Sequence, residues 1–440
     1  AELSIKLEGN EMYVYVQHKD GRPLMPTKRL GKVRHLLKDG MAKVVKRTPF
    51  TIRLLYDTKY FTQPITLGVD AGSKTIGLSA TTDEDELYAA NVELRTDIVK
   101  LLSDRRALRC SRRNRKRRYR AARFDNRVGR KKRGWLAPSI EQKIATHFKV
   151  IADVHKILPI TKIIVETASF DTQKLKNDAI SGYEYQQGDQ LGFWNVREYV
   201  LFRDNHECQH CHGKSNDKIL NVHHLESRKT GGDAPNNLIT LCETCHKAYH
   251  AGKIKIDAKR GKSYRDAAFM GIMRWAFYNR LKERYGNVSM TFGYLTKNTR
   301  IENGLEKDHC VDARCISGHP KATPLDCWYK QKATRRHNRQ IHKLTILKGG
   351  YRKANQAPKY VFGYQLFDKV RMPDGREGLV FGRRTRGSFD IRTLDGERLN
   401  AGISYKKLAL IEKRRTILTE RRARCSSPCL KVWVSVTRIC

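Results

Sequence analysis

The segment “PITLGVDAGSKTIGLSATT” (Pro64–Thr82) predicts an apolar strand, a glycine-containing turn and a second strand. Its first strand carries Asp70, and an acidic side chain on an apolar strand is normally costly to bury. The segment “ITKIIVETASFD” (160–171) repeats this pattern, because Glu166 follows three apolar residues of another predicted strand. A lone acid on a strand is usually a turn or cap residue, but the repetition favours a functional site.

A third element, “DHCVDAR” (308–314), has an H-x-x-D spacing that fits one face of a helix. Acids gathered at the ends of strands suggest a two-metal site for phosphoryl transfer, with ions about 4 Å apart. The three elements, in this order along the chain, resemble the RuvC nuclease, an RNase H-like fold, split into three segments. The predicted catalytic residues and Mg²⁺ ligands of this site are Asp70, Glu166, His309 and Asp312.

Two C-x2-C pairs lie between the second and third elements. Paired thiolates of this kind indicate a structural zinc site with four sulfur ligands. The gap between the pairs is longer than in short zinc ribbons, so we expect a functional insert there. The alternative interpretation is four unrelated thiols. The predicted zinc ligands are Cys208, Cys211, Cys242 and Cys245.

The insert belongs to the stretch “NVHHLESRKTGGDAPNNLITLCETCHKAYH” (Asn221–His250), whose spacing H-H-x12-N-x8-H is that of the HNH nuclease motif. Hydrolysis of a phosphodiester needs an activated water and a cation on the phosphate, and an imidazole accepts a proton near neutral pH. The resemblance assigns the role of base to His224 and the bracing of its loop to Asn237. It assigns one Mg²⁺ ion to His223 and His246.

Other interpretations of this stretch stay open. It could be a purely structural zinc module with spare surface histidines. His210, His212 and His250 have no assigned role, and we expect them at the surface or near the cysteines. In the type II CRISPR effectors an aspartate stands where this chain has His223, which is a softer metal ligand.

The segment “RRALRCSRRNRKRRYRAARFDNRVGRKKR” (105–133) contains 16 Lys or Arg among 29 residues and one acid, Asp125. It supplies about a third of the net charge of +43. A solvated helix face normally mixes both signs, so this composition favours contact with phosphates, which guanidinium groups bind in a bidentate manner. The expected nucleic-acid contacts are Arg105, Arg106, Arg109, Arg112, Arg113, Arg115, Arg117 and Arg118.

The whole chain has 88 Lys and Arg against 45 Asp and Glu, which favours a nucleic-acid partner. Four of its 11 cysteines are in C-x2-C pairs, which favours a reducing compartment and a metal over disulfides. No apolar run approaches the roughly 18 residues of a membrane span, and no secretory signal is visible. We therefore expect a cytoplasmic prokaryotic protein, nucleoid-associated when it acts, with no membrane partner.

The ordered motifs resemble the IscB family, the transposon-associated (OMEGA) RNA-guided nucleases related to the type II CRISPR effectors. “RPLMP” (22–26) and “RRHNRQIHK” (335–343) also match, and the resemblance weakens after about residue 345. It implies an α/β multidomain protein. Its parts would be an RNase H-like (RuvC) core split in three, an inserted ββα-metal HNH domain, an arginine-rich bridge helix, a small N-terminal α+β domain and a small C-terminal β domain.

The expected domain boundaries follow from this order. A helix is predicted over 264–286, followed by a strand over 287–296. The domains are 1–60, an N-terminal PLMP domain; 61–100, RuvC segment I; 101–135, the bridge helix; 136–185, RuvC segment II; 186–262, the HNH domain with a four-cysteine zinc knuckle and linkers; 263–346, RuvC segment III; and 347–440, a C-terminal β domain that reads the target-adjacent motif.

The resemblance implies a monomeric ribonucleoprotein. An omega RNA guide would pair with one strand of double-stranded DNA beside a short adjacent motif. HNH would cut the guide-paired strand with one Mg²⁺, and RuvC would cut the displaced strand with two, while Zn²⁺ would be structural. The alternatives are a protein-guided HNH endonuclease of homing or intron type, and an RNA-guided DNA-binding factor without cleavage. Every predicted catalytic position is present, which argues against the last.

Overall fold

In a computed structural model, the chain divides into two compact units. The first unit consists of Ala1–Ala168 together with Ile272–Cys440, and the second consists of Ser169–Gly271. No helix within the described residues is both long enough and apolar enough to cross a membrane. The structure describes residues 13–114, 134–167, 190–193, 195–226, 232–258, 265–336 and 358–424.

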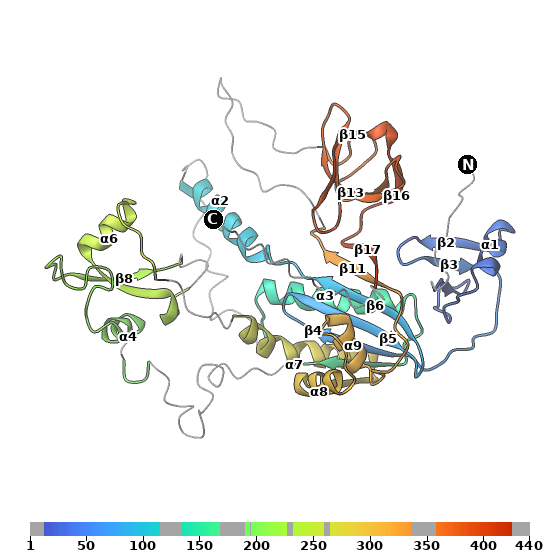
Figure 1. Cartoon of the computed structure of the whole chain (residues 1–440), viewed down its shortest axis with the longest axis horizontal. Coiled ribbons are helices and arrows are strands. Elements are labelled where there is room, and N and C mark those ends of the chain that lie inside the picture. Colours follow the sequence, from blue (N-terminus) through green and yellow to red (C-terminus); the bar gives the residue numbers. More distant parts are fainter. Residues whose placement is uncertain are drawn as a thin grey trace, which may run out of the picture. The chain divides into compact units, whose positions relative to one another are not determined.

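A seven-stranded sheet forms the centre of the first unit (Figure 1). β10, β7 and β4 run parallel, β4, β5 and β6 form an antiparallel meander, and β11 pairs parallel to β6 and antiparallel to β17. The sheet's apolar residues are buried, as the continuous apolar runs predicted. In sheet order the strands are β10 (Val288–Thr291), β7 (Lys162–Glu166), β4 (Thr66–Ala71), β5 (Thr75–Thr81), β6 (Glu86–Glu93), β11 (Cys327–Ala333) and β17 (Ile417–Ala423).

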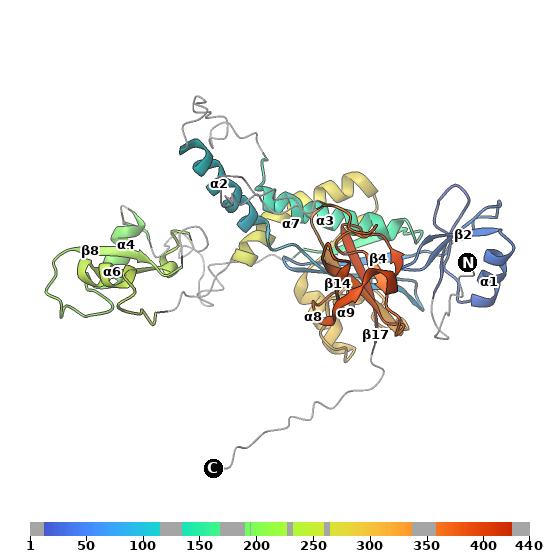
Figure 2. The ribbon, with the colours of Figure 1, turned by 90° about the horizontal axis from the view of Figure 1, so that it is seen from above.

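Helices cover both faces of this sheet, with α8 and α9 on one face and α3 and α7 on the other (Figure 2). α9 approaches β4 and β5 closely, because a Cβ on Gly68 would lie 1.9 Å from the Ala313 carbonyl oxygen. A Cβ on Gly77 would lie 2.0 Å from the His309 carbonyl oxygen. Only glycine at these two positions permits the contact. The helices are α3 (Pro138–His155), α7 (Arg265–Tyr285), α8 (Gly293–Glu302) and α9 (His309–Ile316).

The predicted helix over 264–286 is confirmed by α7, but the strand predicted over 287–296 is shorter than expected. β10 stops at Thr291, and α8 begins two residues later at Gly293. Apolar alternation continues past Thr291, so periodicity alone did not reveal the turn into a helix.

The N-terminal part is a three-stranded sheet with one helix, where the resemblance implied a small α+β domain. Its strands are ordered β1-β3-β2, and its core contains Val33 and Ile52. It contacts the large sheet, because the Tyr15 hydroxyl donates to the Leu87 carbonyl over 2.8 Å. The elements are β1 (Tyr15–Gln17), α1 (Leu30–Lys38), β2 (Ala42–Lys46) and β3 (Thr51–Leu54).

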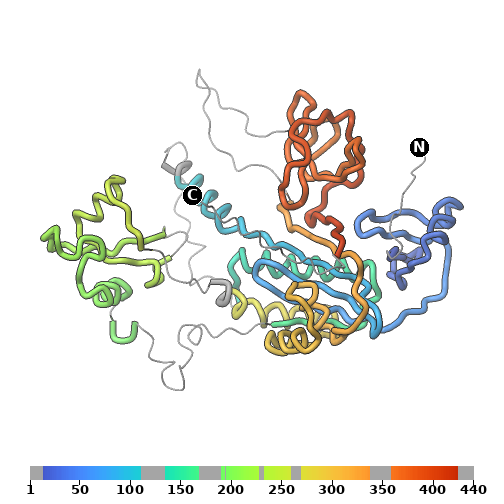
Figure 3. Tube along the Cα trace, viewed as in Figure 1, coloured from blue at the N-terminus to red at the C-terminus, as the bar shows by residue number. Residues whose placement is uncertain are grey.

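A five-stranded antiparallel sheet, ordered β15-β14-β13-β12-β16, lies near the C-terminus, where a small β domain was expected. The expected boundary at residue 347 also included β17, but β17 pairs with β11 in the large sheet. In Figure 3 the red end of the described trace leaves the five-stranded sheet and returns to the large one. The strands are β12 (Lys369–Arg371), β13 (Glu377–Arg383), β14 (Ser388–Arg392), β15 (Arg398–Ser404) and β16 (Ala409–Glu412).

The second unit contains a β-hairpin and a helix, preceded by another helix. β8 and β9 pair antiparallel, and Leu241 and Cys242 of β9 are buried in its core. Asp204, at the end of α4, accepts a hydrogen bond from the Thr240 backbone over 2.8 Å and so ties α4 to β9. The elements are α4 (Val196–Arg203), β8 (Leu220–His224), η3 (Pro235–Asn237), β9 (Leu238–Cys242) and α6 (Glu243–His250).

Candidate functional site

The first candidate site lies where β4, β7 and α9 meet. Asp70 and Glu166 are directly paired residues on adjacent parallel strands. α9 crosses β4 and β5 at the two glycines and carries His309 and Asp312 to the same place. The Nδ1 atom of His309 lies 2.6 Å from Oδ2 of Asp70. The structure therefore brings together all four residues predicted for this site, although three separate segments supply them.

Burial and crowded negative charge control the protonation of this site. Burial raises the pKa of Glu166 to about 7, and the charges of Asp70 and Asp312 add to the rise. Burial and the charge of Asp70 also raise the pKa of Asp312. The hydrogen bond to Asp70 raises the pKa of His309. Carboxylates that repel one another in a partly buried site fit divalent cations, which would remove the repulsion.

Arg300 is a residue of this site that the sequence pattern did not reveal. It lies on α8, and its Nε atom is 2.9 Å from Oδ1 of Asp312. Both side chains are largely buried, with 14% and 18% exposed. The positive charge opposes the rise in the pKa of Asp312. No spacing rule connects an arginine with an acid across a turn between two helices, so only the fold indicates this pair.

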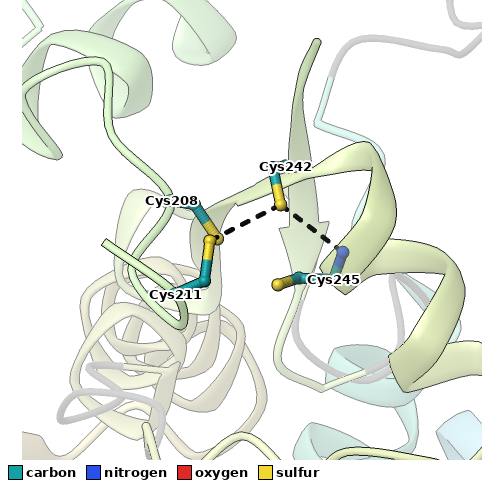
Figure 4. A group of neighbouring side chains, drawn as sticks. All are labelled: Cys208, Cys211, Cys242 and Cys245. Carbon is teal, nitrogen blue, oxygen red and sulfur yellow. Dashed lines mark hydrogen bonds between the residues drawn. The ribbon is translucent and has the colours of Figure 1, made fainter. Parts of the chain in front are cut away.

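The second candidate site is the cysteine cluster of the second unit (Figure 4). Ligand atoms of all four predicted cysteines lie within 4.8 Å of one another. The Sγ atoms of Cys211 and Cys242 are 3.7 Å apart. Tetrahedral sulfur ligands at about 2.3 Å from zinc would be separated by roughly 3.8 Å, so the donor set fits Zn²⁺. The Ser215 hydroxyl, 3.2 Å from the Cys211 sulfur, lowers the pKa of that thiol to about 6.

The third candidate site contains three histidines, where the sequence pattern assigned two. Ligand atoms of His223, His246 and His250 lie within 4.8 Å of one another. The Nε2 atoms of His246 and His250 are 3.3 Å apart, a separation that suits two nitrogens on one tetrahedral ion at about 2.0–2.1 Å. His250 was expected to have no role, although its i, i+4 spacing from His246 on a helix could have indicated one.

Burial favours the neutral form of His223, which is the form that binds a metal ion. The side chain lies on β8 and packs against Tyr249, with ring centroids 4.6 Å apart. Burial, followed by the neighbouring histidines His246 and His250, lowers the pKa of His223 to about 4. Its Nε2 atom is buried and has no hydrogen-bond partner within the described residues. A neutral imidazole with a buried unpaired nitrogen fits metal ligation.

The remaining two residues of the predicted motif flank this cluster. His224 is half-exposed, and its Nε2 atom lies 2.9 Å from Oδ1 of Asp233, a partner not foreseen from the sequence. Asn237 is fully buried and bonds to Glu226 and Gly232, which lie on either side of a segment outside the described residues. It accepts from the Glu226 amide over 2.9 Å and donates to the Gly232 carbonyl over 2.9 Å. These bonds fit the bracing role that the motif assigned to Asn237.

The arginine-rich segment is only partly described. Helix α2 (Ile98–Asn114) begins it, and the Arg105, Arg106 and Arg109 side chains are exposed there. The expected contacts Arg112 and Arg113 lie on the last turn of α2, where the side chains are outside the described set. The other expected contacts, Arg115, Arg117 and Arg118, lie outside the described residues.

Comparison with known families identifies one part of the chain. A model described as HNH endonuclease matches residues 208–252, which contain both the cysteine and the histidine clusters. This segment is an HNH endonuclease domain. A second model, described as RRXRR protein, matches residues 14–188. The HNH domain therefore follows the RRXRR match in the sequence and supplies the second and third candidate sites.

Individual proteins are similar to shorter parts of the chain. Anaredoxin from Nostoc sp. is 41% identical over 66 residues, which are 15% of this chain and 84% of anaredoxin. A crystal structure of Streptococcus thermophilus Cas9 in complex with the GGAA PAM is 13% identical, with a TM-score of 0.30, and the match covers 59% of this chain and 33% of that one. The Type II-C Cas9 enzyme from Actinomyces naeslundii is 16% identical, with a TM-score of 0.16, and the match covers 41% and 31%. This chain spans about a third of the Cas9 chains at most.

Proposed function

We propose that this protein is an RNA-guided double-stranded DNA endonuclease of the IscB type, with two separate nuclease sites. The observation that carries this proposal is the meeting of Asp70, Glu166, His309 and Asp312 in a unit distinct from the HNH domain. The strand order β6-β5-β4-β7-β10, with an antiparallel meander and two further parallel strands, supports an RNase H-like (RuvC) core. The HNH domain is inserted between β7 and β10.

In the HNH domain, His224 would remove the proton from the attacking water. Asp233 would orient the His224 ring through their 2.9 Å contact. A divalent ion on the histidine cluster would polarise the scissile phosphate. Three imidazoles favour a transition metal over the Mg²⁺ expected from the motif, because Mg²⁺ prefers oxygen ligands. The proposed ligands are His223, His246 and His250.

In the RuvC-like site, the carboxylates Asp70, Glu166 and Asp312 would hold two Mg²⁺ ions, which would supply Lewis acids on either side of the phosphate. His309 binds Asp70 through Nδ1, so Nε2 remains for proton exchange with water. This unit would cut the displaced DNA strand, and the HNH domain would cut the strand paired with the guide.

The chain's charge supports a polyanionic guide. The net charge of +43 would destabilise a compact chain without counter-charge, and an omega RNA guide would supply it. The exposed arginines of α2 are proposed to contact that RNA as a bridge helix. The five-stranded sheet is proposed to read the DNA motif adjacent to the target. The active form would be a monomeric ribonucleoprotein in the cytoplasm, with zinc in its cysteine cluster.

Purification from the native host followed by sequencing of the bound RNA tests this function. We expect one structured RNA species whose variable end directs cleavage of matching double-stranded DNA. Reconstitution with a reprogrammed guide should redirect the cut. Cleavage without RNA at a fixed site would instead favour a protein-guided HNH endonuclease. DNA binding without any cut would favour a binding factor.

A further inference from the structure

Two aromatic rings stand exposed beside the carboxylate cluster. Phe292 and Tyr294 are 39% and 64% exposed, respectively. Their ring planes differ by 11°, and their centroids are 6.1 Å apart. Within the described residues, the aromatic contact recorded for each of these rings is the other ring. Exposure of apolar ring surface to water is unfavourable, so two adjacent exposed rings mark a candidate contact surface for a ligand.

The position of these rings is fixed relative to Glu166. Thr291, the last residue of β10, pairs directly with Glu166 of β7. Phe292 and Tyr294 flank Gly293, and a Cβ on Gly293 would lie 2.8 Å from Oε1 of Glu166. Farther along the same helix, Arg300 contacts Asp312. The two rings therefore lie at the start of α8, a helix whose first residue approaches Glu166 and whose Arg300 contacts Asp312.

We infer that Phe292 and Tyr294 form a base-stacking platform for the nucleic-acid strand that is cut at the carboxylate cluster. This inference rests on the proposed function, because it assumes that the cluster hydrolyses a phosphodiester. A flat ring stacks on any base, so such a platform positions a strand without selecting its sequence. Bases of an intact duplex already stack on one another, so the platform takes an unpaired strand.

The charge around the rings favours a nucleic acid over an apolar protein surface. Lys297 is exposed one turn along α8, and Lys307, which is also exposed, lies close enough to Asp312 for its positive charge to act on that carboxylate. A polyanion would thus meet cations beside the rings. Stacking near the scissile phosphate would fix the strand's position, which makes both aromatic residues positioning residues and not catalytic ones.

The test uses the full ribonucleoprotein and single-stranded DNA that carries 2-aminopurine at successive positions, with Ca²⁺ in place of Mg²⁺ to prevent cleavage. The parent should quench the fluorophore at one or two positions near the cut. The double variant Phe292→Leu/Tyr294→Leu keeps apolar volume but removes the rings. It should lose this quenching and bind the strand about tenfold more weakly. Phe61→Leu, which changes another exposed ring, is the matched control and should behave as the parent.

The outcomes separate this inference from the proposed function. Unchanged quenching and unchanged cleavage of the displaced strand in the double leucine variant would overturn the platform and leave the nuclease intact. Suppose instead that quenching depends on the rings but that Asp70→Ala cuts the displaced strand as the parent does, or that the parent does not cut it. This result would support the platform and refute the nuclease assignment of the carboxylate cluster. If leucine preserves function but Phe292→Ala/Tyr294→Ala abolishes it, an apolar protein partner occupies the patch and the platform is wrong.

Discussion

The Nδ1 atom of His309 lies 2.6 Å from Oδ2 of Asp70, although the two residues are 239 positions apart in the sequence. The contact exists because α9 can lie against β4 and β5 only where Gly68 and Gly77 remove the side chains. Replacing Gly68 with alanine would put Cβ 1.9 Å from a backbone oxygen, so the helix would have to move. The carboxylate cluster thus depends on how closely a helix packs on a sheet.

Gly68→Ala should therefore damage the carboxylate site without touching any of its side chains. We expect cleavage of the displaced strand to fall by at least about tenfold, because displacement of catalytic groups by 1 Å can reduce rates 10²-fold. Gly31→Ala, at a position with nothing within 4 Å of the added Cβ, is the control. Parent-like cutting of the displaced strand by Gly68→Ala would show that the close approach does not position the site.

Glu166 should make stability depend on pH when Mg²⁺ is absent. Its folded-state pKa of about 7 exceeds the ordinary value of 4.5, so the folded protein binds more protons than the unfolded chain between these values. The free energy of unfolding therefore falls as the pH rises from about 4.5 to 7. Glu166→Gln cannot ionise, so its free energy of unfolding should not fall in this range. At pH 8 the variant should avoid a loss of stability on the order of 1 kcal/mol that the parent suffers. The variant should also fail to cut the displaced strand.

Chemical denaturation at pH 5 and pH 8, with zinc retained, measures this effect. Glu302→Gln, on the exposed surface of α8, serves as the control. Adding Mg²⁺ at pH 8 should stabilise the parent more than Glu166→Gln, which keeps only two of the three carboxylates. An identical pH dependence in the parent and in Glu166→Gln would contradict the raised pKa.

The cysteine cluster should hold one zinc ion that supports the HNH domain. Cys242 is buried and its sulfur also accepts a hydrogen bond from the Cys245 amide at the start of α6. Cys242→Ser should lose the zinc and the cut in the guide-paired strand, while RNA binding and the cut in the displaced strand survive. Cys110→Ser, which changes an exposed thiol, should keep all of these activities. Elemental analysis that finds no zinc in the pure parent protein would refute this assignment.

His250 should be the third ligand of the catalytic ion in the HNH domain. His250→Ala should weaken Co²⁺ binding at that site by at least about tenfold, which corresponds to roughly 1.4 kcal/mol, and should change the visible absorption of the bound cobalt. His210→Ala, on the exposed surface, is the control. The cysteine cluster must be filled with zinc before the titration. Cobalt affinity and absorption equal to those of the parent would leave His250 outside the site.

Local patterns predicted the elements of the sites better than their partners. Three patterns could be recognised because each lies within a single strand, helix or turn, which sets the direction of its side chains. They are the acids on apolar strands, the H-x-x-D helix and the C-x2-C pairs. By contrast, the pairing of β17 with β11 and the contacts of Arg300 and Asp233 depend on where distant segments meet. His250 was predictable only in part. Its i, i+4 spacing from His246 is visible in the sequence, but its proximity to His223 depends on how the β8–β9 hairpin folds.

Strand-resolved cleavage by two variants tests the central claim, that one chain carries two independent nuclease sites. The measurement uses guide-loaded protein and double-stranded DNA with a different label on each strand. His224→Ala should cut only the displaced strand, and Asp70→Ala should cut only the guide-paired strand, each at a rate close to that of the parent. Loss of both cuts in either variant, or both cuts persisting in Asp70→Ala, would contradict the account.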